Sequence, residues 1–353
     1  MRLLIINPGS TSTKVALTQG SVIQASKILY HDLDSLQKCI RVIEQVDMRL
    51  QAIEAFLAEQ GEVLSNLAAI VGRGGLLNPV SSGTYRVNKK MLEDLRRGKK
   101  GEHASNLGGI LAQALADRVG IPAFIVDPPS VDEFEESARI SGLPELPRHS
   151  QLHALNIRRV ALRVAQELQK PLNQCNFIVV HIGGGISVAA LRQGKIVDVN
   201  SANNAGPFTP ERSGGLPARE LLKICFSGQF TEQELIRRLN GQSGWVGYLG
   251  CNDGREVEKK MRDGEEEARL LFDGMAYQIA MEIGAMSAVL KSFDGVIYTG
   301  GLAHSQLLLQ GIQAYVQYLG PSFTVPGENE LLALAEGAVR VLNGEEQVRV
   351  YGS

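Results

Sequence analysis

The chain has 353 residues, a formal net charge of −2 at pH 7, 44% hydrophobic residues and 21% charged residues. This length predicts two domains, each large enough for its own core, and the near-neutral charge gives no reason to expect nucleic acid or a membrane surface as a partner. No stretch approaches the roughly 18 apolar residues of a membrane span, the first apolar run is too short for a secretory signal, and the 4 cysteines lack CxxC spacing. We therefore expect a cytoplasmic globular protein.

One sequence pattern occurs twice. Residues 4–17 and 178–191 each contain an apolar run, a polar turn with glycine and a second apolar run, and the equivalent residues Asn7 and His181 are 174 positions apart. Each copy predicts a β-hairpin, and the N–H groups of such turns bind phosphate oxygens. The repeat predicts two related domains that face one cleft, each with a phosphate-binding hairpin.

The first half otherwise alternates helices and strands. Apolar residues at helical spacing predict a helix over 36–60, and another helix is predicted over 105–119. Short buried strands are predicted at 68–71 and 123–126. Arg73 and Asp127 follow these strands, and open α/β sheets bind ligands at the carboxyl ends of their strands. Both side chains are therefore candidate site residues.

The second half begins after a candidate linker at residues 142–147. Helices are predicted at 150–169, 265–292 and 330–342, with the second hairpin, the loop 203–217 and a strand at 296–298 between them. We predict a first domain at 1–148 and a second domain at 149–330. The last helix, within about 331–350, is expected to pack back on the first domain.

The family is indicated by six motifs that occur in a fixed order. The chain has neither a GxxxxGK[ST] P-loop nor a GxGxxG that opens a βαβ unit. It instead resembles the acetate/butyrate kinase (acetokinase) family of the sugar kinase–Hsp70–actin superfamily, most closely the butyrate kinase branch. The motifs are Asn7-x-Gly9-Ser10-x-Ser12-x-Lys14, His181-x-Gly183-x-Gly185, Phe208-Thr209-Pro210, Ser243 to Arg255, Thr299-Gly300-Gly301 and Asn329-Glu330.

This resemblance implies a fold, domain roles, a reaction and its cofactors. The first domain is expected to take the acyl substrate and phosphate, and the second domain is expected to bind the nucleotide. The fold is α/β: a two-domain, duplicated, ribonuclease-H-like (actin-like ATPase) fold with a central interdomain cleft, in a homo-oligomer (dimer or higher). The reaction is direct in-line phosphoryl transfer, ATP + butyrate = ADP + butyryl phosphate, with Mg²⁺. A carboxylic acid is already ionised at neutral pH, so no general base is needed. The site must position two anions and neutralise charge on the moving phosphoryl group.

The resemblance also implies catalytic roles. Arg73 grips the substrate carboxylate in bidentate fashion, unless it forms a structural ion pair. Arg219 acts on the transition state, with Arg212 as the alternative. His149 donates a hydrogen bond to the transferred phosphoryl group, supported by His153 on the same helix face, although an HxxxH pair could also bind a metal. His103 matches another family histidine only after a gap.

The remaining implied contacts are to ATP and Mg²⁺. The two hairpins contribute Asn7, Ser10, Ser12, Lys14, His181, Gly183, Gly184 and Gly185, which contact the phosphates. Asp253 and Arg255 lie around the adenosine, and Thr299, Gly300 and Gly301 lie beneath it. The metal-linked carboxylates are Glu330 and Asp127. Alternatives stay open: Lys14 could face solvent, His181 could be a core histidine, Asp127 could form an Asx turn, and Glu330 could cap a helix.

Substrate length has one readable indication, at Gly75. Acetate kinases carry an apolar side chain at this position, so its loss is expected to lengthen the pocket and favour butyrate, at about 0.8 kcal/mol per buried CH₂. Isobutyrate, isovalerate, propionate and acetate remain alternative acids. An actin- or Hsp70-like interaction protein would need a further segment, and a sugar kinase would need a catalytic Asp.

Overall fold

The computed structural model describes residues 1–352, which divide into two compact units. The first unit contains Met1–Asp132 and the chain from Asn329 onward, and the second contains Glu133–Glu328. Residues 133–148, predicted in the first domain, therefore lie in the second. They are tied to its sheet, because Arg148 Nη2 donates to Asp198 Oδ1 at 2.8 Å. The segment 142–147 lies inside this unit, so its prediction as the linker is wrong.

The first unit is built on a seven-stranded sheet of order β12-β5-β6-β4-β1-β2-β3. Its strands are β1 (Arg2–Pro8), β2 (Ser12–Gln19), β3 (Val22–Tyr30), β4 (Ala69–Arg73), β5 (Thr84–Arg86), β6 (Ala123–Val126) and β12 (Arg349–Val350). Its helices are α1 (Leu33–Lys38), α2 (Val46–Glu59), α3 (Lys89–Arg97), α4 (Asn106–Ala116) and α13 (Glu330–Leu342), with the 3₁₀ turns η1 (Val42–Gln45) and η2 (Leu64–Asn66).

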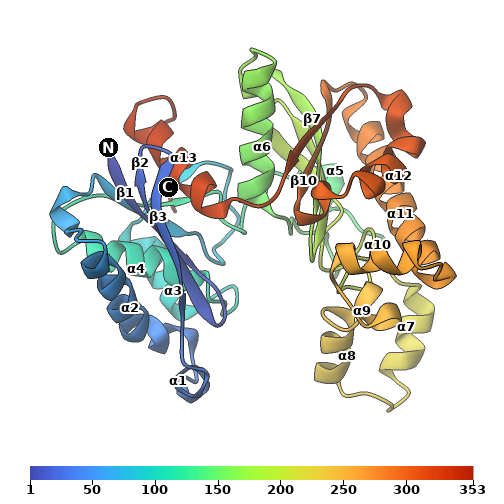
Figure 1. Cartoon of the computed structure of the whole chain (residues 1–353), viewed down its shortest axis with the longest axis horizontal. Coiled ribbons are helices and arrows are strands. Elements are labelled where there is room, and N and C mark those ends of the chain that lie inside the picture. Colours follow the sequence, from blue (N-terminus) through green and yellow to red (C-terminus); the bar gives the residue numbers. More distant parts are fainter. Residues whose placement is uncertain (353) are drawn as a thin grey trace. The chain divides into compact units, whose positions relative to one another are not determined.

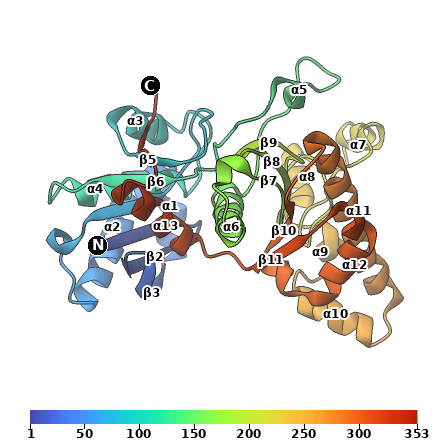
Figure 2. The same ribbon diagram turned by 90° about the horizontal axis from the view of Figure 1, so that it is seen from above.

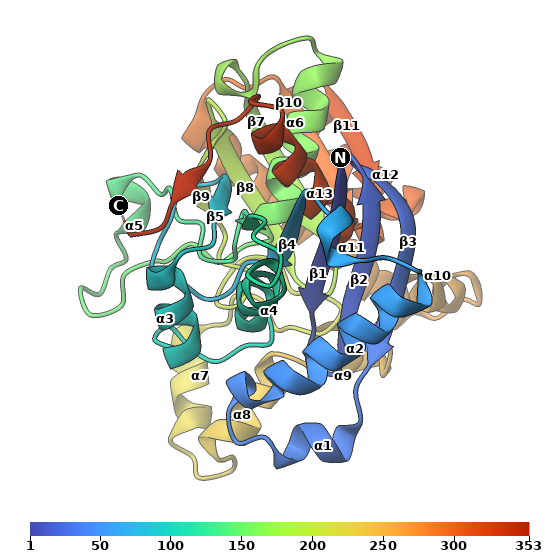
Figure 3. The ribbon, with the colours of Figure 1, turned by 90° about the vertical axis from the view of Figure 1, so that its left-hand side faces the viewer.

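Two helices cover opposite faces of this sheet. Gly109 of α4 lies against Ile125 of β6, while Gly337 of α13 lies against Val126. Successive strand residues point to opposite faces, so α4 and α13 sandwich the strands between them. Figure 3 shows α2 and α4 on the face turned toward the viewer. The last helix thus packs on the first unit, which brings Glu330 to the carboxyl end of β1.

The helix predicted over 36–60 is interrupted in the structure. It forms α1, the extended residues Cys39–Arg41, η1 and then α2. Carboxylates take over the backbone hydrogen bonds at the break: Glu44 Oε2 accepts from the Ile40 N–H and Glu102 Oε2 from the Val42 N–H, both at 2.9 Å. The spacing of apolar residues does not reveal where side chains replace the backbone hydrogen bonds of a helix.

The second unit is built on a five-stranded sheet of order β11-β10-β7-β8-β9. Its strands are β7 (Asn176–Ile182), β8 (Ile186–Arg192), β9 (Lys195–Val199), β10 (Gly295–Gly300) and β11 (Ser322–Pro326). Its helices are α5 (Glu136–Arg139), α6 (Ala154–Glu167), α7 (Ala218–Cys225), α8 (Glu232–Leu239), α9 (Gly244–Leu249), α10 (Gly254–Arg262), α11 (Glu266–Leu290) and α12 (Gln306–Val316). Short 3₁₀ turns are η3 (Leu172–Gln174), η4 (Gly301–His304) and η5 (Gln317–Leu319).

The core of this unit lies between the sheet and α11. Ile178 and Val180 of β7 join the apolar cluster with Ile279 and Ile283 of α11, and α12 packs beside α11 (Figure 2). The helix α6 contacts β7 and β10 and brings Asn156 to His181. Among residues 1–352, no helix has the length and apolar content needed to cross a bilayer.

The two sheets share one five-strand plan; Figure 1 labels β1, β2 and β3 of the first sheet and β7 and β10 of the second. The orders β6-β4-β1-β2-β3 and β11-β10-β7-β8-β9 both contain two parallel pairs followed by two antiparallel pairs. The offset of 174 residues also aligns the strand ends, Pro8 with Ile182 and Ser12 with Ile186. The duplicated hairpins predicted from the sequence are therefore present.

Candidate active site

The first hairpin presents an exposed polar turn between β1 and β2. Ser10 and Lys14 are exposed, Ser12 is half-buried, and Asn7 is buried at the end of β1. The turn is closed by the Gly9 N–H, which donates to Ser12 O at 2.7 Å. Lys14 therefore faces solvent in this structure, the alternative left open by the sequence, whereas the backbone N–H groups of the turn remain available to an anion.

Arg73, Glu330 and Asn7 form a cluster beside this turn. Asn7 Nδ2 donates to Glu330 Oε2 at 2.6 Å, and Arg73 Nη2 lies 3.6 Å from Glu330 Oε1. Arg73 is only 13% exposed, and its Nη1 is buried without a hydrogen-bond partner within residues 1–352. An orphaned guanidinium N–H is costly unless a ligand accepts from it, so Arg73 keeps capacity for a carboxylate besides its ion pair.

Glu330 does not cap its helix. Asn329 is the N-cap of α13, and its side chain accepts from the Leu332 N–H. Glu330 stands in the first helical turn, where an anion is favoured, and its carboxylate instead joins Asn7 and Arg73. The capping alternative for Glu330 is therefore wrong.

The glycines around Arg73 serve packing rather than substrate approach. A Cβ at Gly72 would lie 2.1 Å from Gly108 O, and one at Gly75 would lie 2.6 Å from Asn106 Cα. These residues let the end of β4 contact the start of α4 backbone to backbone. The prediction that Gly75 lengthens the acyl pocket is wrong, because the space of its missing side chain is filled by Asn106 and Leu95.

Asp127 ends β6 in a left-handed conformation, with φ of 37°. Its carboxylate is buried, and Oδ1 accepts from the Gly83 N–H at 2.6 Å. A non-glycine residue held at positive φ is strained, and such strain concentrates at functional positions. Within the first unit, Asp127 thus ties the end of β6 to the loop before β5.

His103 is better placed than the sequence indicated. Partial burial of its ring and the positive charge of Arg73 lower the pKa of His103. Its Nδ1 lies 2.8 Å from Ser105 Oγ. In the sequence, His103 was indicated only by its match to a family histidine, and that match requires a gap.

The second hairpin holds a buried histidine. His181 is 1% exposed, and its Nδ1 accepts from Asn156 Nδ2 at 2.9 Å, so Nε2 carries the proton. Nε2 lies 2.9 Å from Glu328 Oε1 but is not aligned for a hydrogen bond. The ring of His153 stacks on His181 at 3.9 Å. His181 therefore has one fixed nitrogen and one buried donor, rather than two satisfied ones.

The histidines His149 and His153 do not share a helix face. The helix α6 begins at Ala154 with His153 as its N-cap, and His149 lies exposed in the preceding segment. Residues 1–352 contain no group of three His, Cys, Asp or Glu side chains arranged to hold a metal. The shared helix face on which the HxxxH alternative was based is therefore absent for His149 and His153.

Arg212, not Arg219, lies at the second hairpin. A Cβ at Gly185 would lie 2.7 Å from Arg212 Nη1, and that nitrogen donates to Asn203 Oδ1 at 2.6 Å. Burial lowers the pKa of the Arg212 guanidinium. Arg219 stands on the exposed face of α7, which has no buried residue. The loop after Phe208-Thr209-Pro210 thus turns back and delivers its first arginine to the hairpin.

A cavity of about 860 Å³ in the second unit is lined by five of the predicted nucleotide residues, Gly183, Gly184, Asp253, Arg255 and Gly301. Volumes of 300–1,000 Å³ are typical of small-molecule sites. Its lining also includes Asn252, Gly254, His304 and Glu328.

Local contacts explain the backbone and side-chain positions at and next to this cavity. Asp253 caps α10 through the Arg255 N–H, and its ion pair with Arg255 lowers the pKa of the carboxyl to about 2. Gly300 has φ of 90°, and a Cβ there would lie 2.4 Å from Ile182 O, so only glycine fits. Thr299 Oγ1 accepts from Asn156 at 3.0 Å, which links this wall to His181.

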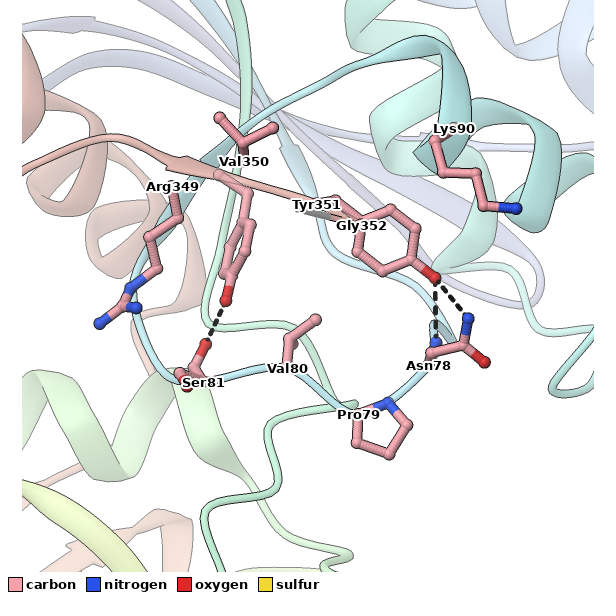
Figure 4. Close-up of a pocket in the computed structure, with 10 residues that line it drawn as sticks. Asn78, Pro79, Val80, Ser81, Lys90, Arg349, Val350, Tyr351 and Gly352 are labelled. Atoms are coloured by element: carbon pink, nitrogen blue, oxygen red, sulfur yellow. Dashed lines mark hydrogen bonds between the residues drawn. The ribbon is translucent and has the colours of Figure 1, made fainter.

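Another cavity, of about 520 Å³, lies beside β12 in the first unit (Figure 4). Asn78, Ser81, Tyr85, Lys90 and Tyr351 are among its lining residues. Asn78 donates to the Tyr351 hydroxyl, which donates to Asp94. It contains none of the predicted site residues, so its size does not make it the active site.

The carboxylate of Glu330 fits an Mg²⁺ ion that is also bound by water and substrate phosphates, rather than one enclosed by protein ligands. Mg²⁺ usually keeps several waters and takes only one or two carboxylates along with substrate phosphates. Glu330 is 30% exposed and offers such a carboxylate, whereas Asp127 is buried.

Comparison with known proteins identifies the family. The chain is 52% identical over 352 residues to the probable butyrate kinase 2 of Caldanaerobacter subterraneus subsp. tengcongensis, with 99% of each chain covered. Residues 147–325 match the model of the Acetokinase family. The chain belongs to the acetokinase family. Butyrate kinase 2 of Clostridium acetobutylicum is 46% identical to this acetokinase-family chain, again over 99% of both. The family predicted from the ordered motifs is confirmed.

Solved structures show the same fold. An acetate kinase from Porphyromonas gingivalis has a TM-score of 0.78 at 18% identity, covering 96% of this acetokinase-family chain and 98% of that chain. A propionate kinase from Francisella tularensis has a TM-score of 0.73 at 19% identity, covering 95% and 98%. The predicted duplicated α/β, actin-like ATPase fold is confirmed.

Proposed function

We propose that this protein is a short-chain carboxylate kinase that transfers the γ-phosphoryl group of ATP to butyrate. The observation that carries the proposal is 46–52% identity, over 99% of the chain, to butyrate kinases from two bacteria. The local geometry supports it, since an arginine with a buried unpaired N–H suits a carboxylate and the glycine-lined cavity suits a nucleotide.

The proposed roles follow the chemistry of each group. Arg73 binds the acid through its spare Nη1, while Glu330, which accepts from Asn7, forms an ion pair with the guanidinium. The substrate carboxylate is the nucleophile and needs no base. Mg²⁺, when bound with ATP, neutralises phosphate charge; Glu330 would hold it through its carboxylate, with Asp127 from the family resemblance as the second residue proposed near it.

Arg212 and His181 are proposed to stabilise the negative charge on the transferred phosphoryl group. Arg212 lies against Gly185 and donates to the neutral acceptors Ala202 O and Asn203 Oδ1. Burial lowers the pKa of its guanidinium despite the opposing effect of the Glu211 carboxylate. His181 offers the buried Nε2 proton near Gly183. His149, named by the family resemblance, is proposed as a further donor. Arg212 replaces Arg219 as the proposed transition-state arginine.

The test is a hydroxylamine trap for acyl phosphate. The protein is incubated with ATP, Mg²⁺ and one of acetate, propionate, butyrate, isobutyrate or isovalerate, with reactions lacking ATP as controls. Two extra buried methylenes at about 0.8 kcal/mol each predict a kcat/KM roughly tenfold higher for butyrate than for acetate. No hydroxamate with any acid would contradict the enzyme class, and a preference for acetate would contradict the acid.

A further inference from the structure

Arg49 is a charged residue outside the predicted site, and it is fully buried at 0% exposed. It lies on α2, which crosses the end of the first hairpin (Figure 3). Its guanidinium donates to Gly9 O at 2.9 Å, Ser10 O at 3.3 Å and Ser12 O at 3.0 Å. It also donates to Thr13 Oγ1 at 2.8 Å and to Gln45 Oε1. One side chain thus binds the carbonyl oxygens of Gly9, Ser10 and Ser12 in this turn.

These bonds fix the direction of the turn's N–H groups. In a trans peptide the C=O of one residue and the N–H of the next point in opposite directions, and residues 1–352 contain no cis peptide bond. Because Gly9 O and Ser10 O face Arg49, the N–H groups of Ser10 and Thr11 face away from it. Ser10 and Thr11 are exposed, so two parallel donors point outward as an anion-binding nest.

The charge of Arg49 is not cancelled by its surroundings. Burial lowers the pKa of Arg49 to about 10, which leaves it protonated at neutral pH, and all its hydrogen-bond acceptors are uncharged. His31 Nε2 lies within hydrogen-bond distance of Thr13 Oγ1, at 2.8 Å, and burial together with Arg49 lowers the pKa of His31 to about 4, so it is neutral. A buried positive charge without a carboxylate partner is unfavourable unless an anion approaches.

We propose that Arg49 is a positioning residue for phosphoryl transfer. It aims the Ser10 and Thr11 N–H groups at the transferred phosphoryl group, and its buried charge stabilises that group through the turn. The inference rests on the proposed kinase function but concerns a residue that touches neither substrate. It explains why an uncompensated arginine is kept behind a glycine-containing turn.

The sharpest test is Gln45→Glu, which cancels the charge without removing Arg49. The new carboxylate can accept the same two hydrogen bonds from the guanidinium, and Gln51→Glu adds the same charge on the exposed face of α2 as a matched control. Loss of a direct oxyanion donor costs about 10²–10³ in kcat, so this indirect change should cost about tenfold. Arg49→Lys, which keeps the charge but not the fork, should lose less than Arg49→Met.

A purely structural role would give a different kinetic pattern. Butyrate and ADP do not carry the transferred phosphoryl group, so Gln45→Glu should leave their KM values within about twofold while kcat falls in both directions. The melting temperature should not fall, because the hydrogen bonds remain. An unchanged kcat for Gln45→Glu would overturn the proposal, as would an equal loss in Gln51→Glu.

A second readout does not depend on activity. Inorganic phosphate is titrated while the melting temperature is followed, and phosphate should stabilise the wild type and Gln51→Glu more than Gln45→Glu. Equal stabilisation of all three would contradict the role of Arg49. A wild type that binds phosphate with this difference but forms no acyl phosphate would instead contradict the proposed function.

Discussion

Arg73 and Arg212 differ in their surroundings, and this difference supports the separate roles proposed for them. Arg73 is mostly buried beside the carboxylate of Glu330, which offsets its charge, so it suits steady binding of an acid. Arg212 is half-buried and held by the neutral acceptors Ala202 O and Asn203 Oδ1. Its charge remains available to a group that becomes more anionic during the reaction.

The two arginines should therefore fail differently. Arg73→Ala is expected mainly to raise the KM for the acid, and Arg212→Ala mainly to lower kcat, by about 10³ as is typical for a phosphoryl-transfer arginine. Arg219→Ala, on the exposed α7, serves as the matched control and should stay near wild type. Steady-state kinetics with circular dichroism to check folding would decide. A large kcat loss in Arg219→Ala with none in Arg212→Ala would reverse the assignment.

At this scale the sequence predicted the polar residues better than their partners. Arg73, Asn7 and Glu330 were all singled out, yet both Asn7 and Arg73 contact Glu330, which lies far from them in the sequence. Arg212 and Arg219 could not be separated, because spacing within a loop does not say which way the loop turns. Arg49 was missed because a single arginine in a helix pattern carries no sign of burial.

At the scale of elements, the contact between β4 and α4 depends on glycine. Gly72 faces Gly108, and Gly75 faces Asn106 and Leu95, so the strand that carries Arg73 is seated directly on the helix. Helix and strand backbones can approach this closely only without side chains between them. The position of Arg73 is therefore set by packing beneath it.

Gly75→Val should destabilise the fold rather than retune the acid preference. Its Cβ would lie 2.6 Å from the Asn106 backbone, and overpacking of this kind costs about 1–3 kcal/mol. The control is Gly142→Ala, where nothing lies within 4 Å of the added Cβ. Urea denaturation of both variants measures the free energy of unfolding. A Gly75→Val protein of wild-type stability with a shifted acid preference would restore the pocket interpretation.

Elements with strong local signals were predicted well from the sequence. Both hairpins, the strands before Arg73 and Asp127, and the last helix agree with the structure within a few residues. The helix over 36–60 and the start of α6 were wrong, because their limits depend on Glu44, Glu102 and the cap at His153. Helix limits of this type are decided by side chains that the periodicity of apolar residues does not register.

At the scale of the whole molecule, duplication organises the chemistry. Each unit has the same five-strand plan, and each carries one glycine-containing hairpin next to a polar residue, Asn7 or His181. The fold class was predictable from this repeat because the repeat is itself a property of the sequence. The unit boundary was not, because residues 133–148 have no strong pattern and are placed by contacts with β9. Cytoplasmic location and a homo-oligomer stay predictions.

The most direct test of the central claim is ³¹P NMR of the protein with ATP, Mg²⁺ and butyrate. Direct phosphoryl transfer predicts a butyryl phosphate resonance that grows with one ADP formed for each acyl phosphate. It should be absent without butyrate and greatly reduced in Arg212→Ala. ADP accompanied only by inorganic phosphate, with no acyl phosphate even at early times, would contradict the account.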